Sequence, residues 1–179
     1  MHVLLWLARA IDALNETIGR SVKWLVLLAT LVSAGNATLR YGFDLSSNAW
    51  LELQWYLFAL IFLLGAGYTL KHNGHVRIDV IYGRLGPRGQ AWIDLFGSLL
   101  FLLPMAGLMA WFSGSMFSEA WAIQETSADS GGLLRWPIKL ALPLGFGLLF
   151  LQGVAEIIKR IGMLQGHLPF PVERAEEVV

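Results

Sequence analysis

Glu52 is the strongest candidate in this sequence for a charged functional residue inside a membrane. It lies beside Gln54, Trp55 and Tyr56 and directly precedes the uncharged run 53–70. A carboxylate at such a place can hold a proton or a cation, which is how transporters use intramembrane charges. The alternative is a polar contact between helices or at the membrane surface. We favour this alternative because the sequence pairs no second carboxylate with Glu52.

Two further sets of polar residues lie at the ends of apolar runs. Asp94 precedes the uncharged run 95–118, and the dipole of a helix that begins there stabilises a negative charge. Gln152 and Glu156 are four residues apart and share a helix face, and Lys159 follows within one turn. The helix dipole suffices to explain Asp94, and the second set predicts an ion pair at the membrane surface rather than a reaction centre.

Cysteine and the common catalytic and cofactor-binding motifs are missing from the sequence. There is no Cys, which excludes disulfides, thiolate catalysis and Cys-held clusters. There is no nucleophile elbow, phosphate-binding loop or zinc-protease motif. No histidine lies within an uncharged run, which argues against a haem, and His72 with His75 is a weak metal signal. We therefore expect no enzyme activity, no metal and no cofactor.

Composition places the chain in a lipid bilayer. Hydrophobic residues make up 56% of the 179 residues and charged residues 15%, against about 25% in a soluble domain. The formal net charge is zero and no basic face is evident, so nucleic acid is not an expected partner. Four uncharged runs predict an all-α protein with membrane-spanning helices at about 22–42, 50–71, 91–118 and 136–158.

These four spans are expected to form one domain, residues 1–165, followed by a mobile tail, residues 166–179. Residues 1–20 have an amphipathic pattern, which we interpret as a helix lying in the membrane interface. The alternative is a helix docked on a partner. A short interfacial helix is expected in the middle loop, ending near Gly86-Pro87, and Pro104 predicts a kink or tilt in the third span.

The distribution of Lys and Arg predicts the orientation of the chain. The N-terminal segment, the middle loop and the tail together carry ten of these residues, and the two other connections carry three. Because positively charged loops stay in the cytosol, both ends of the chain are expected there.

The residues by themselves favour an accessory or scaffold role. Four spans without paired buried charges, and without a discontinuous helix around a binding site, make a poor transporter on their own. Two other hypotheses stay open: a membrane-anchor subunit of another complex, such as a redox enzyme, and an autonomous small carrier that uses Glu52. A haem absorption band in the purified protein would favour the first. Uptake by the chain alone in liposomes would favour the second.

Four stretches of the sequence, in their order and spacing, resemble one known family. They are Leu39-Arg40-Tyr41, Glu52 to Phe58 with its continuation to Tyr68, His75 to Val80, and Trp136 to Lys139 with its continuation to Gly153. The family is the small permease subunit, or Q subunit, of tripartite ATP-independent periplasmic (TRAP) transporters, and the resemblance covers roughly residues 7–161.

This resemblance implies a secondary, usually sodium-driven importer of carboxylates in the cytoplasmic membrane of a bacterium or archaeon. In that family the small subunit braces a large membrane subunit, which carries the substrate and sodium sites, and a periplasmic substrate-binding protein delivers the substrate. Ser47 to Trp50 and Ser130 to Leu133 further resemble a branch linked to mannitol, chloroaromatic or 2-oxo acid transport. Substrate choice itself is expected to reside in the binding protein.

The resemblance also implies roles for individual residues. The residues assigned to structure and subunit contact are Glu52, Gln54, Trp55, Arg77, Asp79, Trp136, Pro137 and Lys139. The acidic residues assigned to contact with the periplasmic binding protein are Glu119, Glu125 and Asp129. For the first set, membrane anchoring and positive-inside topology are an alternative of equal weight.

Overall fold

The computed structural model describes residues 1–45, 47–75 and 82–170, and most of these residues are helical. The helices are α1 (His2–Phe43), α2 (Asn48–Lys71), α4 (Pro87–Gly97), the π-helical turn η1 (Ser98–Leu102), α5 (Leu103–Ala122) and α6 (Trp136–Leu164). The described part holds no β-strand, although Thr126 and Leu134 form an isolated bridge. Four stretches are long and apolar enough to cross a membrane: α1, α2, α4 through α5, and α6. The predicted class, an all-α membrane protein with four spanning helices, is confirmed.

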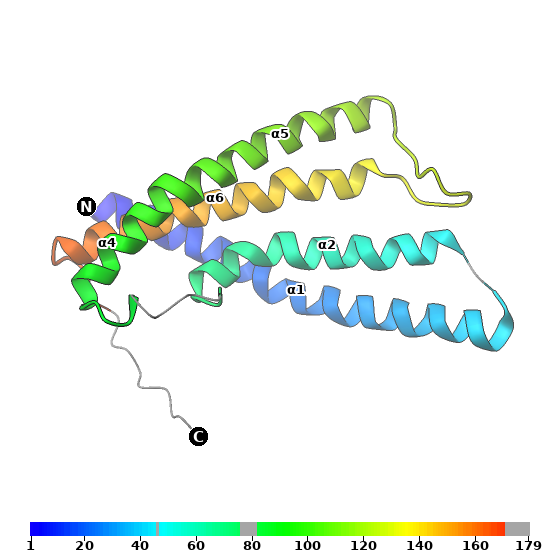
Figure 1. Cartoon of the computed structure of the whole chain (residues 1–179), viewed down its shortest axis with the longest axis horizontal. Coiled ribbons are helices and arrows are strands. Elements are labelled where there is room, and N and C mark those ends of the chain that lie inside the picture. Colours follow the sequence, from blue (N-terminus) through cyan, green and yellow to red (C-terminus); the bar gives the residue numbers. More distant parts are fainter. Residues whose placement is uncertain (46, 76–81, 171–179) are drawn as a thin grey trace, which may run out of the picture.

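The four long stretches form two antiparallel pairs, and α6 is the central helix of the bundle (Figure 1). α1 packs against α2, and α5 packs against α6, while α6 also contacts α1, α2 and α4. The connections after α1 and after α5 lie at one end of the molecule, at the right of Figure 1. The start of α1 and the end of α6 lie together at the other end. Which of these ends faces the cytosol stays a prediction from the Lys and Arg count.

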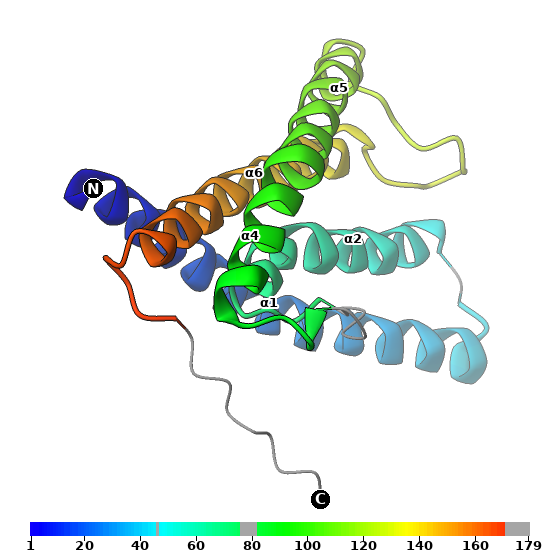
Figure 2. The same ribbon diagram turned by 60° about the vertical axis from the view of Figure 1, so that its left-hand side comes forward.

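The sequence pattern predicted a separate helix for residues 1–20, but this segment is continuous with the first span, and its location in the membrane interface stays a prediction. The segment is the first half of α1, which runs without a break from His2 to Phe43. No proline interrupts this stretch, and Gly19 fits because its bare Cα faces the ring of Tyr68, where a Cβ would collide. Ala8 and Ile11 in this half pack against Ala155 and Ile158 of α6. Figure 2 shows the first half of α1 lying along the last turns of α6.

The third spanning stretch is one continuous helix with a local change of winding. In η1 the N–H of Leu103 bonds to the carbonyl of Ser98, five residues back, instead of four. Pro104 follows directly and has no N–H to donate, so the regular hydrogen-bond ladder is interrupted at this point. The irregularity that Pro104 predicts is therefore a π-helical turn within the stretch Pro87–Ala122.

Small residues set how closely the helices approach. At Gly145 of α6, an added Cβ would lie 2.7 Å from Leu63 Cβ and 2.8 Å from the Leu63 carbonyl oxygen on α2. The large apolar side chains point outward instead, as with Phe62 and Trp111, which are 77% and 78% exposed. An outward apolar surface of this kind is stable in contact with lipid or another membrane subunit.

Some sequence-based predictions fall outside the described residues. They are Arg77 and Asp79, most of the short helix expected in the middle loop, and residues 171–179 of the tail. The remainder of the middle loop, from Tyr82, leads through Gly86 into Pro87, where α4 begins.

Candidate functional site

The carboxylate of Glu52 is held by the connection between α5 and α6. Glu52 lies in the first turns of α2 and is 3% exposed. Its Oε2 accepts the backbone N–H of Leu133 at 2.6 Å, and its Oε1 accepts the hydroxyl of Ser127. The guanidinium of Arg135 lies 3.4 Å from Oε1. These four residues, Glu52, Ser127, Leu133 and Arg135, are called the Glu52 cluster below.

The connection has a folded geometry of its own that presents these groups. The N–H of Ser127 bonds to the Leu133 carbonyl at 2.9 Å, and the N–H of Arg135 bonds to the Glu125 carbonyl at 2.8 Å. Gly131 turns the chain with a φ of 71°, a conformation that suits glycine. A Cβ on Gly132 would lie 2.9 Å from Glu52 Oε1 and would collide with Ser127, so the close approach requires glycine.

A second layer of contacts surrounds the Glu52 cluster. Arg135 also lies over the ring of Trp55 at 5.2 Å, a cation–π contact. The Tyr56 hydroxyl donates to the Leu134 carbonyl at 2.9 Å. Lys139, in the first turn of α6, forms an ion pair with Glu125. The Asn48 amide of α2 also donates to the Ser130 carbonyl at 3.0 Å. The connection is thus fastened to four residues of α2 and to the start of α6.

These contacts decide what Glu52 can do chemically. Both of its oxygens accept hydrogen bonds from the connection, and Arg135 supplies a positive charge nearby. Among the described residues, no second carboxylate contacts it, and no group of acidic or histidine side chains could hold a metal ion. The geometry fits a polar contact between elements better than a site for a moving proton or cation.

The other residues singled out from the sequence lie around the same end of the bundle. Trp136 and Pro137 begin α6, and the Trp136 ring meets the edge of Trp121 at 4.3 Å. Gln54 is half-buried in α2. Glu119 and Asp129 are exposed, whereas Glu125 is half-buried in its ion pair.

A second polar cluster, at the opposite end, joins α1, α2 and α6, and we call it the Glu16 cluster. It comprises Asp12, Asn15, Glu16, Lys71, His72, Gln152, Glu156 and Lys159. Glu16 Oε2 lies 2.7 Å from both Lys71 Nζ and His72 Nε2 on α2. Lys159 on α6 bonds to Asp12 at 3.1 Å and to Glu156 at 2.6 Å.

The centre of the Glu16 cluster is buried and depends on two amides. Asn15 and Gln152 are both 0% exposed, and Asn15 Nδ2 donates to Gln152 Oε1 at 3.0 Å. Gln152 Nε2 in turn donates to Asp12 Oδ1 at 2.7 Å and to Glu156 Oε1 at 3.1 Å. Sequence spacing indicated the pairing of Gln152, Glu156 and Lys159 but missed the α1 partners. The interruption of the apolar pattern of residues 1–20 by Asp12 and Glu16 was the available signal.

The charge of Glu16 is strongly favoured by its surroundings. Hydrogen bonds from Lys71 and His72 lower the pKa of Glu16 from 4.5 to about 2, and Arg20 contributes through a third. Glu16 precedes the expected span 22–42, so these groups lie where water can reach the outer side of the cluster. Glu16 therefore stays ionised at physiological pH.

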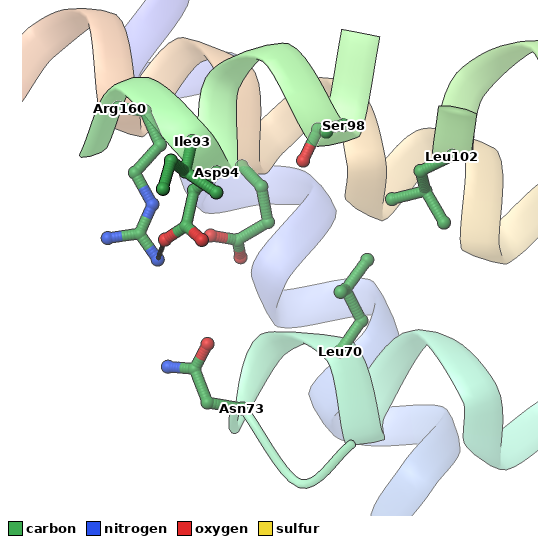
Figure 3. Close-up of a pocket in the computed structure, with 9 residues that line it drawn as sticks. Leu70, Asn73, Ile93, Asp94, Ser98, Leu102 and Arg160 are labelled. Carbon is green, nitrogen blue, oxygen red and sulfur yellow. Dashed lines mark ion pairs between the residues drawn. The ribbon is translucent and has the colours of Figure 1, made fainter. Parts of the chain in front are cut away.

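A separate ion pair joins α4 and α6 at the same end. Arg160 Nη2 lies 3.0 Å from Asp94 Oδ2, and the Tyr82 hydroxyl donates to the same oxygen at 2.9 Å. Figure 3 shows the Asp94 and Arg160 side chains pointing toward one another at the edge of a pocket of about 280 Å³. Leu70 and Leu102 form apolar walls of this pocket. The helix-dipole explanation for Asp94 was wrong, because α4 begins at Pro87 and Asp94 lies beyond its first turn.

The fold and these clusters define a class: a multi-pass helical membrane protein whose charges are paired at the two ends of its bundle. Comparison with known proteins makes the class specific. Residues 29–162 match the family described as tripartite ATP-independent periplasmic transporters, DctQ component. The chain belongs to this family of TRAP transporter small permease components, as the sequence resemblance predicted. It is accordingly a transporter component located in the inner membrane.

Two relatives of the chain are named as members of the same family. A candidate TRAP transporter small permease protein of Haemophilus influenzae is 34% identical over 79 residues, which cover 44% of this chain and 48% of the relative. A C4-dicarboxylate TRAP transporter small permease protein, DctQ, of Pseudomonas aeruginosa is 31% identical over 135 residues, covering 74% of this chain and 62% of the relative. The matched parts thus span about half to three fifths of these relatives. No solved structure matches the chain with significance.

Proposed function

We propose that this chain is the small scaffold subunit of a secondary, sodium-driven importer of carboxylates. It would work with a large TRAP membrane subunit, which carries the substrate and ion sites, and with a periplasmic substrate-binding protein. The observation that carries this proposal is the fixed state of Glu52, whose two oxygens are occupied by the connection between α5 and α6.

The positions of the other charges support the same proposal. Within the described residues, Asp12, Glu16, Glu156 and Asp94 all have cationic partners at one end of the bundle. The runs between the two ends contain no charged residue in any of the four spans. An autonomous carrier would need a charged or polar route between the ends. A rigid bundle tied at both ends is instead suited to bracing a moving partner.

The chemical class of the substrate is proposed from the relatives and from the family. The P. aeruginosa relative carries C4-dicarboxylate in its name. A carboxylate substrate is therefore the first class to test, with 2-oxo acids and aromatic carboxylates as the further candidates from the sequence resemblance. We assign the choice among them to the binding protein, as the family resemblance implies.

We further propose that the exposed carboxylates of Glu119 and Asp129 face the binding protein. Both lie at the end of the bundle that carries the connection 123–135, and both are exposed. Glu125 is a weaker candidate, since its carboxylate is already paired with Lys139. Asp129→Lys should weaken binding-protein-dependent uptake without affecting recovery of the membrane complex.

The proposed function is tested by reconstitution. The chain would be co-expressed with the large subunit and purified through a tag on the chain, and then placed in liposomes with the binding protein and a sodium gradient. We expect uptake of a radiolabelled C4-dicarboxylate, 2-oxo acid or aromatic carboxylate only with all three components. Uptake by this chain alone, abolished by Glu52→Gln, would overturn the scaffold proposal in favour of the autonomous carrier.

A further inference from the structure

Asn36 is a buried amide whose hydrogen-bonding groups are not used. Five polar residues are buried in the described part of the chain: Asn15, Asn36, Glu52, Ser113 and Gln152. Asn15 and Gln152 bond to each other, Glu52 bonds to Leu133, and Ser113 bonds to the Met109 carbonyl. Asn36 is 7% exposed, and within the described residues its side chain makes no hydrogen bond.

The location of Asn36 makes this a costly arrangement in the chain alone. It lies on α1, seven residues before Phe43, or about 10 Å along the helix from that end. The hydrocarbon layer is about 30 Å thick, so this depth is inside it. An amide without partners in hydrocarbon is unfavourable by several kcal/mol on transfer scales, because no water is present to replace the missing bonds.

The remaining exposed part of Asn36 opens onto a groove between α1 and α2. The groove has a volume of about 390 Å³, and Leu31, Gly35, Trp50 and Leu53 line it together with Asn36. A Cβ added at Gly35 would meet no atom within 4 Å, so the floor of the groove is empty at this point. The shape is that of a helix-packing surface: an apolar wall, a glycine that permits close approach and one amide.

We propose that this groove, with Asn36 as its polar anchor, receives a membrane-spanning helix of the large subunit that carries a Ser, Thr, Asn or Gln side chain. The amide needs an acceptor for its N–H groups and a donor for its oxygen. A lipid acyl chain offers neither, and a lipid ester offers acceptors alone. A polar side chain on a neighbouring helix supplies both, which is how membrane helices use such residues. The inference rests on the proposed function, because it assigns the partner surface of that scaffold.

The test compares three variants of the chain co-expressed with the large subunit. Asn36→Leu removes the amide, Gly35→Leu fills the groove, and Gly114→Leu on α5 is the matched control, because a Cβ at Gly114 also meets open space. We expect the association with the large subunit to weaken about three- to thirtyfold for Asn36→Leu, the range of one interhelical hydrogen bond. Gly35→Leu should weaken it at least as much, and Gly114→Leu should leave it unchanged.

Thermal unfolding of the purified chain separates docking from folding. Asn36→Leu removes an unpaired amide from a buried position, so the isolated chain should keep or raise its Tm while its association with the large subunit weakens. A Tm that falls in parallel with the association would overturn the proposal, since Asn36 would then act within the chain. Unchanged association in both Asn36→Leu and Gly35→Leu would also overturn it.

Photocrosslinking identifies the occupant of the groove. A benzoylphenylalanine placed at Leu31, on the exposed rim, should cross-link to the large subunit, and one placed at Trp111 on α5 should not. Cross-links from Leu31 to lipid alone, or to a second copy of the chain, would overturn the groove proposal while an intact complex upholds the proposed function. Failure of the unmodified chain to co-purify with the large subunit would overturn both.

Discussion

The Glu52 carboxylate on α2 accepts the backbone N–H of Leu133 at 2.6 Å, across 81 positions of sequence. This bond fastens the connection between α5 and α6 to the first turns of α2. With the Ser127 hydroxyl and the Arg135 guanidinium on the other oxygen, both carboxylate oxygens have protein donors and a compensating positive charge, which disfavours binding of an added cation.

Removing the carboxylate should therefore release the connection. In Glu52→Ala the N–H of Leu133 loses its acceptor, and its amide hydrogen should exchange with solvent about ten times faster, the scale of one lost charge-assisted hydrogen bond. Glu52→Gln keeps an oxygen for Leu133 but loses the attraction of Arg135, so its effect should be smaller. Hydrogen exchange followed by mass spectrometry over residues 123–135 measures this. Equal protection in Glu52→Ala and wild type would show that the connection holds its shape without Glu52.

How far the sequence alone could predict this arrangement differs between the two ends. The sequence identifies Glu52 as a charge at the edge of an apolar run, together with its neighbours on α2. It does not identify the partners of Glu52, because Ser127 and Leu133 lie in an irregular connection without periodicity. A contact of that kind is set by turn geometry, here by Gly131 and Gly132, rather than by a pattern.

The four spans were predictable because the length of an apolar run is fixed by the thickness of the bilayer. The course of α1 was not predictable, because an amphipathic pattern is the same for a helix on a lipid surface and for one packed on a protein. The polar face of α1 packs on protein at Asp12, which contacts Gln152 and Lys159 on α6. Such contacts join residues about 140 positions apart, and no local pattern reports them.

The buried amides of the Glu16 cluster should behave as a coupled pair. Gln152→Leu removes the acceptor on α6 for the buried Asn15 amide and one donor to Asp12, which keeps its ion pair with Lys159, so it should cost about 1–3 kcal/mol of stability. The same change in a background of Asn15→Ala should cost less, because one of the stranded groups is already gone. Thermal unfolding of the four members of this double-mutant cycle gives the coupling energy. Strictly additive effects would show that the Asn15–Gln152 bond contributes nothing of its own.

Two glycines of α6 offer a matched pair for testing the packing of α2 on α6. Gly145→Ala would bring a Cβ within 2.8 Å of the Leu63 carbonyl oxygen, a backbone atom that cannot rotate away. It should therefore destabilise the chain by about 1–3 kcal/mol, the usual cost of overpacking. Gly147→Ala meets no atom within 4 Å and should be close to neutral. Comparison of Tm in detergent decides this, and equal values for both variants would contradict the close approach of the helices.

Glu16 makes the stability of its cluster sensitive to acid. Hydrogen bonds from Lys71 and His72 hold its pKa at about 2 in the folded chain, below the ordinary 4.5. Because the unfolded chain then binds this proton more tightly, the stabilisation from Glu16 is complete above about pH 4.5 and declines below it. It is lost once the pH falls through about 2.

The difference in Tm between wild type and Glu16→Gln isolates this contribution from the other carboxylates. We expect a constant gap near neutral pH that narrows between pH 4.5 and pH 2. Arg20→Gln serves as the control. Arg20 is a 72% exposed partner of the same carboxylate, so the Tm of Arg20→Gln should stay close to that of wild type. A gap of the same size at neutral pH and at the acid limit would mean that Glu16 stabilises the bundle by packing rather than by its charge.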